Sequence, residues 1–191
     1  MALKFTGESF GIFGPPVNPW RTTVFKITDE DGGTDNRLTW GKPNSSDSFS
    51  SYVQFDGEEF NTGLNNIFYL GDLTYGNGEL KGGTNFEGDF PLEIYLSFSD
   101  PIDREEKFEF SFNLFEVNNT TGDPVLDGDF LRFSDAGLSE ETFKYKGNLY
   151  TLELFGFKTS DGDLTTRGQF NAPEFTVTTT SLFGKVSQVS S

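Results

Sequence analysis

Three polar turns of this sequence gather carboxylates closely enough to suggest a chemistry. Calcium prefers several oxygen ligands, which closely spaced carboxylates and backbone carbonyls can supply when a loop wraps around the ion. The spacing therefore makes calcium a candidate cofactor of these turns. The candidate ligands are Asp29, Asp31 and Asp35 in the first turn, Asp127 and Asp129 in the second, and Asp161 and Asp163 in the third.

The same residues have an ordinary structural interpretation. After Asp29 and Asp31, the fifth position of an EF-hand loop would fall on Gly33, and no glutamate closes the loop. Asp-Gly pairs are also a standard signal of a tight turn between two strands. At this stage both interpretations, calcium binding and turn formation, stay open for each of the three turns.

A second chemistry to consider is glycoside hydrolysis, which uses two carboxylates, one of them with a raised pKa. Glu93, Glu109 and Glu153 lie in predicted strands, but each occupies the polar position of an alternating pattern, where a solvated glutamate is expected. The chain contains no histidine and no cysteine. Histidine-dependent triads, thiolate nucleophiles and the commonest zinc ligands are therefore excluded. We predict that the protein is not an enzyme.

Planar aromatic rings are a third candidate feature, because exposed rings can stack against sugars. Trp20 lies in a proline-rich loop, and Tyr52 and Tyr75 lie near predicted turns. The alternative is that these rings complete the hydrophobic core and leave only their polar ends in water. We name the three as candidate glycan-stacking residues with that alternative open.

The charge limits the partners. With 14 basic and 30 acidic side chains, the net charge is 14 − 30 = −16. Such a balance argues against nucleic acid as a partner and against anionic membrane surfaces. No apolar run approaches the roughly 20 residues that cross a bilayer, so direct membrane insertion is not expected. The first residues contain no long apolar segment, so we expect no export signal in this sequence.

The elements that position these residues are predicted to be strands. The chain has 191 residues with 22 glycines and 8 prolines, and its 23 phenylalanines compensate for a modest apolar content. Residues 90–98 and 107–115 alternate apolar and polar side chains, a period of two that suits a half-buried strand. Short strands with regular turns predict one antiparallel β-sandwich of jelly-roll type over residues 1–191. The only helical candidate is residues 134–141.

Residues 142–157 give the clearest core signal. A turn at Lys146-Gly147-Asn148 separates two alternating segments, and Tyr150, Leu152 and Leu154 share one face of the second. This second segment becomes apolar on both faces before Gly156, which indicates a bulge or a strand covered on both sides. We predict a β-hairpin that anchors the fold.

An ordered set of short motifs along nearly the whole chain resembles the choice-of-anchor K domain. That family occurs mainly in cyanobacterial and other bacterial surface or exported proteins, and it has no agreed catalytic residues. The resemblance implies an extracellular or cell-surface location. The motifs are Lys4-Phe5-Thr6-Gly7, Leu38-Thr39-Trp40-Gly41, Phe68-Tyr69-Leu70-Gly71-Asp72-Leu73-Thr74-Tyr75 with Asn77-Gly78, Asn118-Asn119 leading to Asp129-Phe130, Tyr150-Thr151-Leu152-Glu153-Leu154-Phe155-Gly156-Phe157, and Glu174 with Leu182-Phe183-Gly184.

These observations favour a non-catalytic structural or adhesive module, with copies of itself or other surface components as partners. Self-assembly would use free edge strands or strands donated from the chain ends, for which residues 3–10 and 175–189 are β-prone. The alternative function is a calcium-assisted carbohydrate-binding module with a polysaccharide as ligand.

Overall fold

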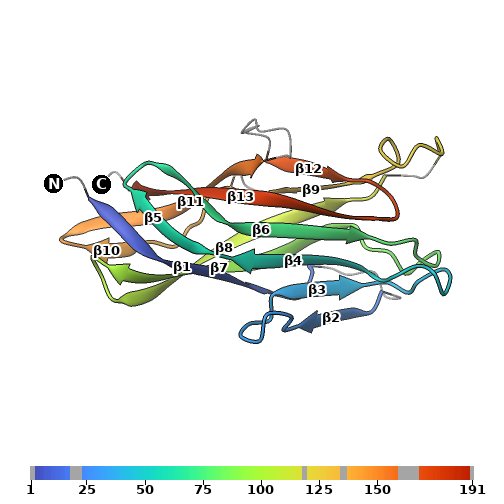
Figure 1. Ribbon diagram of the computed structural model, residues 1–191, viewed down its shortest axis with the longest axis horizontal. Coiled ribbons are helices and arrows are strands. Elements are labelled where there is room, and N and C mark those ends of the chain that lie inside the picture. The colour runs from blue at the N-terminus through green and yellow to red at the C-terminus, as the bar shows by residue number, and fades with distance from the viewer. Residues whose placement is uncertain (1–2, 18–22, 118–119, 134–136, 159–167, 190–191) are drawn as a thin grey trace.

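The computed structural model describes residues 3–17, 23–117, 120–133, 137–158 and 168–189 (Figure 1). In these ranges every regular element is a β-strand, and two curled antiparallel sheets pack face to face. The predicted antiparallel sandwich is therefore confirmed. Of residues 134–141, the structure describes 137–141, in which Gly137 has 3-10 geometry and no α-helix is present. No described helix is long and apolar enough to cross a membrane.

The described residues form thirteen strands, which divide between a six-stranded and a seven-stranded sheet, here called sheet A and sheet B. Sheet A has the order β12 (Gln169–Ala172), β9 (Asp129–Phe133), β8 (Arg104–Phe115), β7 (Gly88–Asp100), β1 (Lys4–Phe13) and β5 (Glu59–Gly63). Sheet B has the order β10 (Phe143–Tyr145), β11 (Asn148–Lys158), β13 (Thr176–Gln188), β6 (Ile67–Asn77), β4 (Ser51–Gly57), β3 (Arg37–Trp40) and β2 (Phe25–Thr28).

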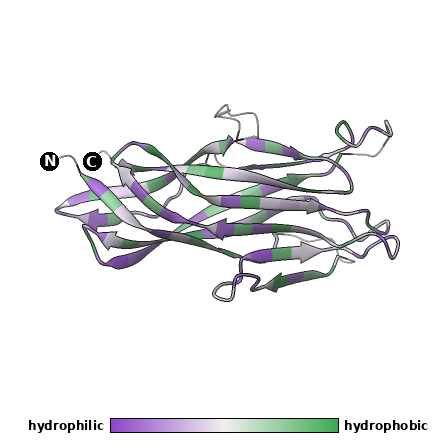
Figure 2. Cartoon of the chain, in the orientation of Figure 1, coloured by the Kyte–Doolittle hydropathy of each residue, from purple (hydrophilic) through white to green (hydrophobic). Residues whose placement is uncertain are grey.

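Alternation along the strands builds the core between the sheets. Hydrophobic and hydrophilic residues follow each other along most strands in Figure 2, and the burial pattern has the same period. The apolar sets of residues 90–98 and 107–115 point inward as predicted. Full burial of one such side chain contributes about 1.5–3 kcal/mol. The buried members are Phe90, Leu92, Ile94, Leu96 and Phe98 in β7, and Phe108, Phe110, Phe112 and Leu114 in β8.

The predicted hairpin is present as β10 and β11. Tyr145 faces Asn148 across a two-residue turn, and Lys146 and Gly147 have φ values of 46° and 85°. Positive φ at both central residues is the requirement of the turn that suits the right-handed twist of paired strands. The register of β11 against β13 shifts between Leu154 and Gly156, so the predicted bulge is also confirmed.

Neither terminal strand is a free edge. β1 is hydrogen-bonded to β5 on one side and β7 on the other, and β13 lies between β11 and β6. Donation of either strand to another molecule would therefore release two hydrogen-bonded neighbours.

The true edge strands are β12, β5, β10 and β2, which have only three to five residues each. Short edges are a common means of preventing edge-to-edge pairing. Pairing with another molecule without breaking existing strand pairs would therefore have to use these four short edges and not the terminal strands.

Candidate functional site

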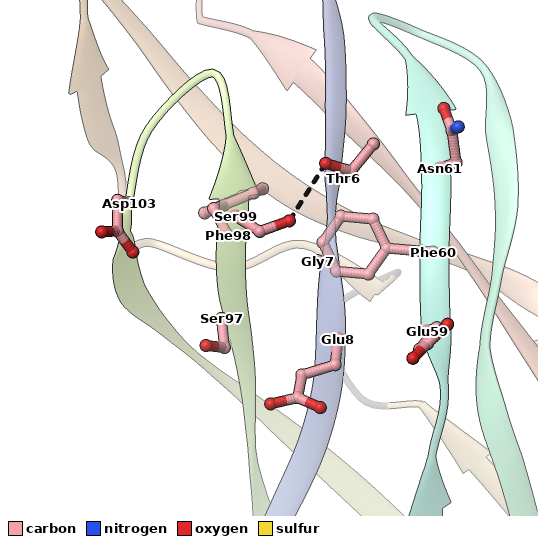
Figure 3. A pocket seen from close by; sticks show the side chains of 10 residues that line it. All are labelled: Thr6, Gly7, Glu8, Glu59, Phe60, Asn61, Ser97, Phe98, Ser99 and Asp103. Atoms are coloured by element: carbon pink, nitrogen blue, oxygen red, sulfur yellow. Dashed lines mark hydrogen bonds between the residues drawn. The ribbon is translucent and has the colours of Figure 1, made fainter.

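A hollow of about 510 Å³ opens on the outer face of sheet A, toward the end of the sandwich where both termini lie (Figures 1 and 3). It extends across β5, β1 and β7 and reaches the loop that joins β7 to β8. Its lining combines small hydroxyl side chains with carboxylates and one amide. The lining residues are Thr6, Gly7, Glu8, Glu59, Phe60, Asn61, Ser97, Phe98, Ser99 and Asp103.

The strand period explains how these polar side chains come together. In β1 the buried Phe5 and Ser9 alternate with Thr6 and Glu8, which therefore point outward. Glu8 stands opposite Ser97 in the register of β1 against β7. Because serine and threonine are short, the outer surface is hollow where larger side chains would fill it.

A register shift in the pairing of β1 with β7 shapes the floor of the hollow. Thr6 pairs with Asp100 and Gly7 with Phe98, which leaves Ser99 as the extra residue of the bulge. The hydroxyls of Thr6 and Ser99 share a hydrogen bond of 3.1 Å (Figure 3). A Cβ atom at Gly7 would lie 2.2 Å from the backbone oxygen of Ser97, so this close approach of the two strands requires glycine.

The rings of Phe60 and Phe98 lie on the inner face of the same strands, behind the backbone of sheet A. Both are buried, and their centroids are 5.8 Å apart at an interplanar angle of 88°. Phe98 also contacts Phe5, with centroids 5.5 Å apart. Edge-to-face packing of this kind holds aromatic side chains in fixed orientations. The strands that form the floor of the hollow therefore rest on a firmly packed aromatic layer.

The electrostatics of the hollow favour hydrogen-bond donors. Glu8, Glu59 and Asp103 are exposed carboxylates on its rim, and no basic side chain lines it. Within the described ranges none of the three forms an ion pair. In the same ranges no group of three acidic side chains is close enough to hold a metal ion. Sugar hydroxyls, which donate and accept hydrogen bonds, match this lining.

Two aromatic rings continue the same face beyond the hollow. Phe10 stands opposite Tyr95, two residues along the register from the pair of Glu8 and Ser97, and their rings stack with centroids 4.9 Å apart and planes 4° apart. The Tyr95 hydroxyl donates to Glu93 at 2.8 Å, and Lys107 donates to the same carboxylate at 2.7 Å. The Lys107 hydrogen bond lowers the pKa of Glu93, whereas burial and then Glu93 raise the pKa of Tyr95. These contacts fix the Tyr95 ring.

Sequence reasoning did not find Phe10 and Tyr95 as candidate stacking residues, although a signal for Tyr95 was present. Tyr95 occupies the polar position of the strand whose other face is buried, and an aromatic ring at a solvent-facing position is unusual enough to be noticed. The position of Phe10 beside it depends on the register of β1, which the sequence does not show.

In the first acidic turn, the two leading carboxylates accept hydrogen bonds from the backbone. Asp29 Oδ1 accepts from the N–H groups of Asp31, Gly32 and Gly33, and Asp31 Oδ1 accepts from those of Gly33 and Thr34. Partial burial raises the pKa of Asp31, but the hydrogen bonds from Thr34 and Gly33 outweigh it and the net shift is downward. This is the side-chain-to-backbone pattern of an Asx turn. Asp35 lies exposed in the same loop.

Asp127 is used in a similar way in the second turn. Its carboxylate accepts from the backbone N–H groups of Thr120, Thr121 and Gly122 at 2.8–3.2 Å. Burial acts to raise its pKa, but these hydrogen bonds lower it overall. Asp161 and Asp163, in the third turn, lie outside the described residues.

Asp129 accepts hydrogen bonds from a different set of partners, so the two carboxylates do not share a site. It is 1% exposed; Tyr75 donates its hydroxyl to Oδ2 at 2.8 Å, and the N–H of Val117 donates to Oδ1 at 3.0 Å. Burial raises the pKa of Asp129 from 3.8 to about 6, against the opposing effect of these two hydrogen bonds.

Of the predicted glycan-stacking residues, the two that the structure describes, Tyr52 and Tyr75, do not form a site together. Tyr75 is 0% exposed and its hydroxyl is occupied by Asp129, so the prediction that its ring can receive a sugar is wrong. The ring of Tyr52 is half-buried under the Arg37 guanidinium, 4.4 Å from the ring centroid. Trp20 lies outside the described residues.

Of the three glutamates considered for glycoside hydrolysis, Glu153 lies apart from the other two. Glu93 and Glu109 are opposite each other on sheet A, whereas Glu153 lies on sheet B and pairs with Lys185 at 2.9 Å. The pKa of Glu93 is lowered by Lys107, whereas a general acid requires a raised one. The lowered pKa of Glu93 therefore argues against a general-acid role for this residue.

Comparison of the chain with protein-family models and with curated proteins finds no match. The resemblance to the choice-of-anchor K domain therefore stays a prediction from the motifs, and the geometry of the outer face of sheet A carries the functional argument.

Proposed function

We propose that this protein is a non-catalytic adhesive module of the cell surface or extracellular space that holds a segment of polysaccharide in the hollow of sheet A. The observation that carries the proposal is the composition of the hollow: hydroxyls from Thr6, Ser97 and Ser99 lie beside carboxylates at the rim, over the paired backbone of β5, β1 and β7. Hydroxyls and carboxylates side by side on one surface suit the hydroxyl edge of a sugar ring, which both donates and accepts hydrogen bonds.

The position of the hollow supports a chain ligand. It lies open on a sheet face, and the stacked rings of Phe10 and Tyr95 lie two residues further along β1 and β7, so a polymer can follow these two strands from the hollow to the rings. Strands of a packed sheet lose little freedom on binding, which reduces the entropic cost of association. The net charge of −16 and the carboxylate rim disfavour acidic polysaccharides, so a neutral one is the expected ligand.

Assembly with copies of itself, which the sequence also suggested, is less well supported. The edge strands are short, and the two terminal strands are paired on both sides. Calcium is not needed for the proposed site, which uses none of the acidic turns.

The proposal can be tested by filling the hollow. Oligosaccharides of glucose, N-acetylglucosamine and galactose are titrated into the whole chain by calorimetry. Ser97→Tyr places a ring in the hollow and is expected to weaken binding roughly tenfold or more. The matched control is Ser111→Tyr, an outward position on β8 outside the hollow, which should bind like the unchanged protein. Equal affinities of the two variants, or no binding of any sugar, would contradict the proposal.

A further inference from the structure

The turn between β12 and β13 presents an exposed aromatic ring from a strained backbone. Phe175 has a φ of 61° and is 56% exposed. Left-handed backbone is costly for a residue with a Cβ atom, and for a bulky side chain it is a true outlier. Glycine or asparagine is the usual residue at such a position. Neither core packing nor backbone preference explains a phenylalanine here.

The strained turn is held firmly by its surroundings. The backbone N–H of Glu174 donates to the carbonyl of Pro124 at 3.0 Å, and the Thr176 hydroxyl donates to the carbonyl of Pro173 at 2.7 Å. Beneath the turn, the Asn77 amide donates to the carbonyl of Ala172 at 3.0 Å. Such contacts let a strained conformation persist, and strain of this kind is concentrated at ligand sites.

Phe175 stands between two hollows. One, of about 180 Å³, is almost wholly apolar, and the other, of about 230 Å³, is mixed. The first is lined by Gly122, Pro124, Asp127 and Glu174 beside Phe175, and the second by Ser45, Asp47, Ser48, Phe49 and Glu79 beside Phe175.

The mixed hollow has the chemistry of a sugar subsite. Phe49 and Phe175 supply aromatic surface, while Asp47 and Glu79 supply carboxylate acceptors. The amide of Asn44 donates to Glu79 Oε1 at 2.9 Å and so fixes that carboxylate, and the second oxygen stays available. Apolar C–H faces of a sugar can lie on the rings while its hydroxyls donate to the carboxylates.

We propose that this loop end is a second saccharide subsite, in which one unit of a neutral sugar stacks on Phe175 and donates hydroxyls to Asp47 and Glu79. The turn lies at the opposite end of the long axis from the hollow of sheet A (Figure 1). Two subsites so far apart let a single chain bridge two polysaccharide strands, which is what an adhesive module needs.

The test follows backbone amide signals of the isotope-labelled whole chain by NMR while the same three oligosaccharides are added. At least one sugar is expected to shift the amides of Phe175, Thr176 and residues 45–48. Phe175→Gly removes the ring and relieves the backbone, so these shifts should disappear while the melting temperature does not fall. Phe175→Asn also tolerates the left-handed conformation and should behave in the same way. Phe115→Ala, which removes an exposed ring on β8, is the control that should keep the shifts.

Two NMR results would overturn this inference: no loop-end shift with any of the sugars, or unchanged shifts in both Phe175 variants. A marked fall of the melting temperature in both variants would also overturn it, because the ring would then have a structural role. The amides of Thr6 and Ser97 report on the sheet A hollow in the same titration. A failure at one end is therefore distinguished from a failure at the other.

Discussion

The two ends of the sandwich are built on different physical principles. Near the termini, Phe5 lies at the centre of a purely aromatic cluster, with ring centroids 5.5–5.9 Å from those of Phe98, Phe143 and Tyr150. At the loop end, buried polar groups enter the interior, where Tyr75 donates to Asp129.

The difference has a functional meaning. Among the described residues, the ring cluster at the termini end contains no buried carboxylate, so the core behind the sheet A hollow should be insensitive to pH. At the loop end, a carboxylate in the interior couples stability to protonation. The predictions below separate the two ends, beginning with the largest effect.

The aromatic end should be the most sensitive to truncation. Phe5→Ala removes a ring that is completely buried and is expected to lower the free energy of unfolding by about 3–5 kcal/mol. Urea denaturation measures this change. Leu149→Ala, at an exposed position of β11, is the control and should cost less than about 0.5 kcal/mol. A loss under about 1 kcal/mol at Phe5 would show that the cluster repacks and is not rigid.

The loop end should show an unusual dependence on pH. Burial raises the pKa of Asp129 from 3.8 to about 6, so the folded state binds a proton that the unfolded state does not between these values. The contribution of Asp129 to the unfolding free energy therefore increases as the pH falls from about 6 to about 4, by up to about 3 kcal/mol. This contribution is lost as the pH rises through about 6.

Asp129→Asn isolates this contribution. Carboxylates with lowered pKa values, such as Glu93, also change the unfolding free energy on acidification, but they do so equally in both proteins. Urea denaturation across this pH range should show the unchanged protein gaining stability relative to the variant as the solution becomes more acidic. Parallel profiles would mean that Asp129 titrates as it does in the unfolded chain.

The hydrogen bond from Tyr75 to Asp129 should matter less than a core ring. Tyr75→Phe keeps the ring but removes the donor from a buried carboxylate, which is expected to cost about 1–3 kcal/mol at neutral pH. Because the uncharged acid needs this donor less, the loss should shrink at acidic pH. A loss that is independent of pH would point to packing as its cause.

The acidic turn of Asp29 and Asp31 should have the smallest effect. Asp31→Ala removes acceptors from an exposed loop and should lower the unfolding free energy by no more than about 1 kcal/mol. Calcium should not raise the melting temperature measurably, because the leading carboxylates already accept backbone N–H groups. A rise with calcium that is lost in Asp31→Ala would restore the calcium interpretation of this turn.

Much of the sheet architecture was predictable because its signals are local. The alternation in β7 and β8, the turn at Lys146 and Gly147 and the bulge before Gly156 each depend on residues that are close in sequence. The candidate site was harder to predict from the sequence. A tyrosine near a turn is compatible with a solvent-facing ring or a buried one, and only the packing of the two sheets decided that Tyr75 is buried.

The sequence by itself therefore determined that this protein is an antiparallel β-sandwich with an acidic surface and a phenylalanine-rich core. Only the tertiary structure decided which strands are neighbours. The hydroxyls of Thr6 and Ser99 meet in the hollow although 93 positions separate them in the chain. β13 became a central strand although it lies near the end of the sequence. The side-chain period belongs to each strand, whereas register depends on the fit of distant strands across the core.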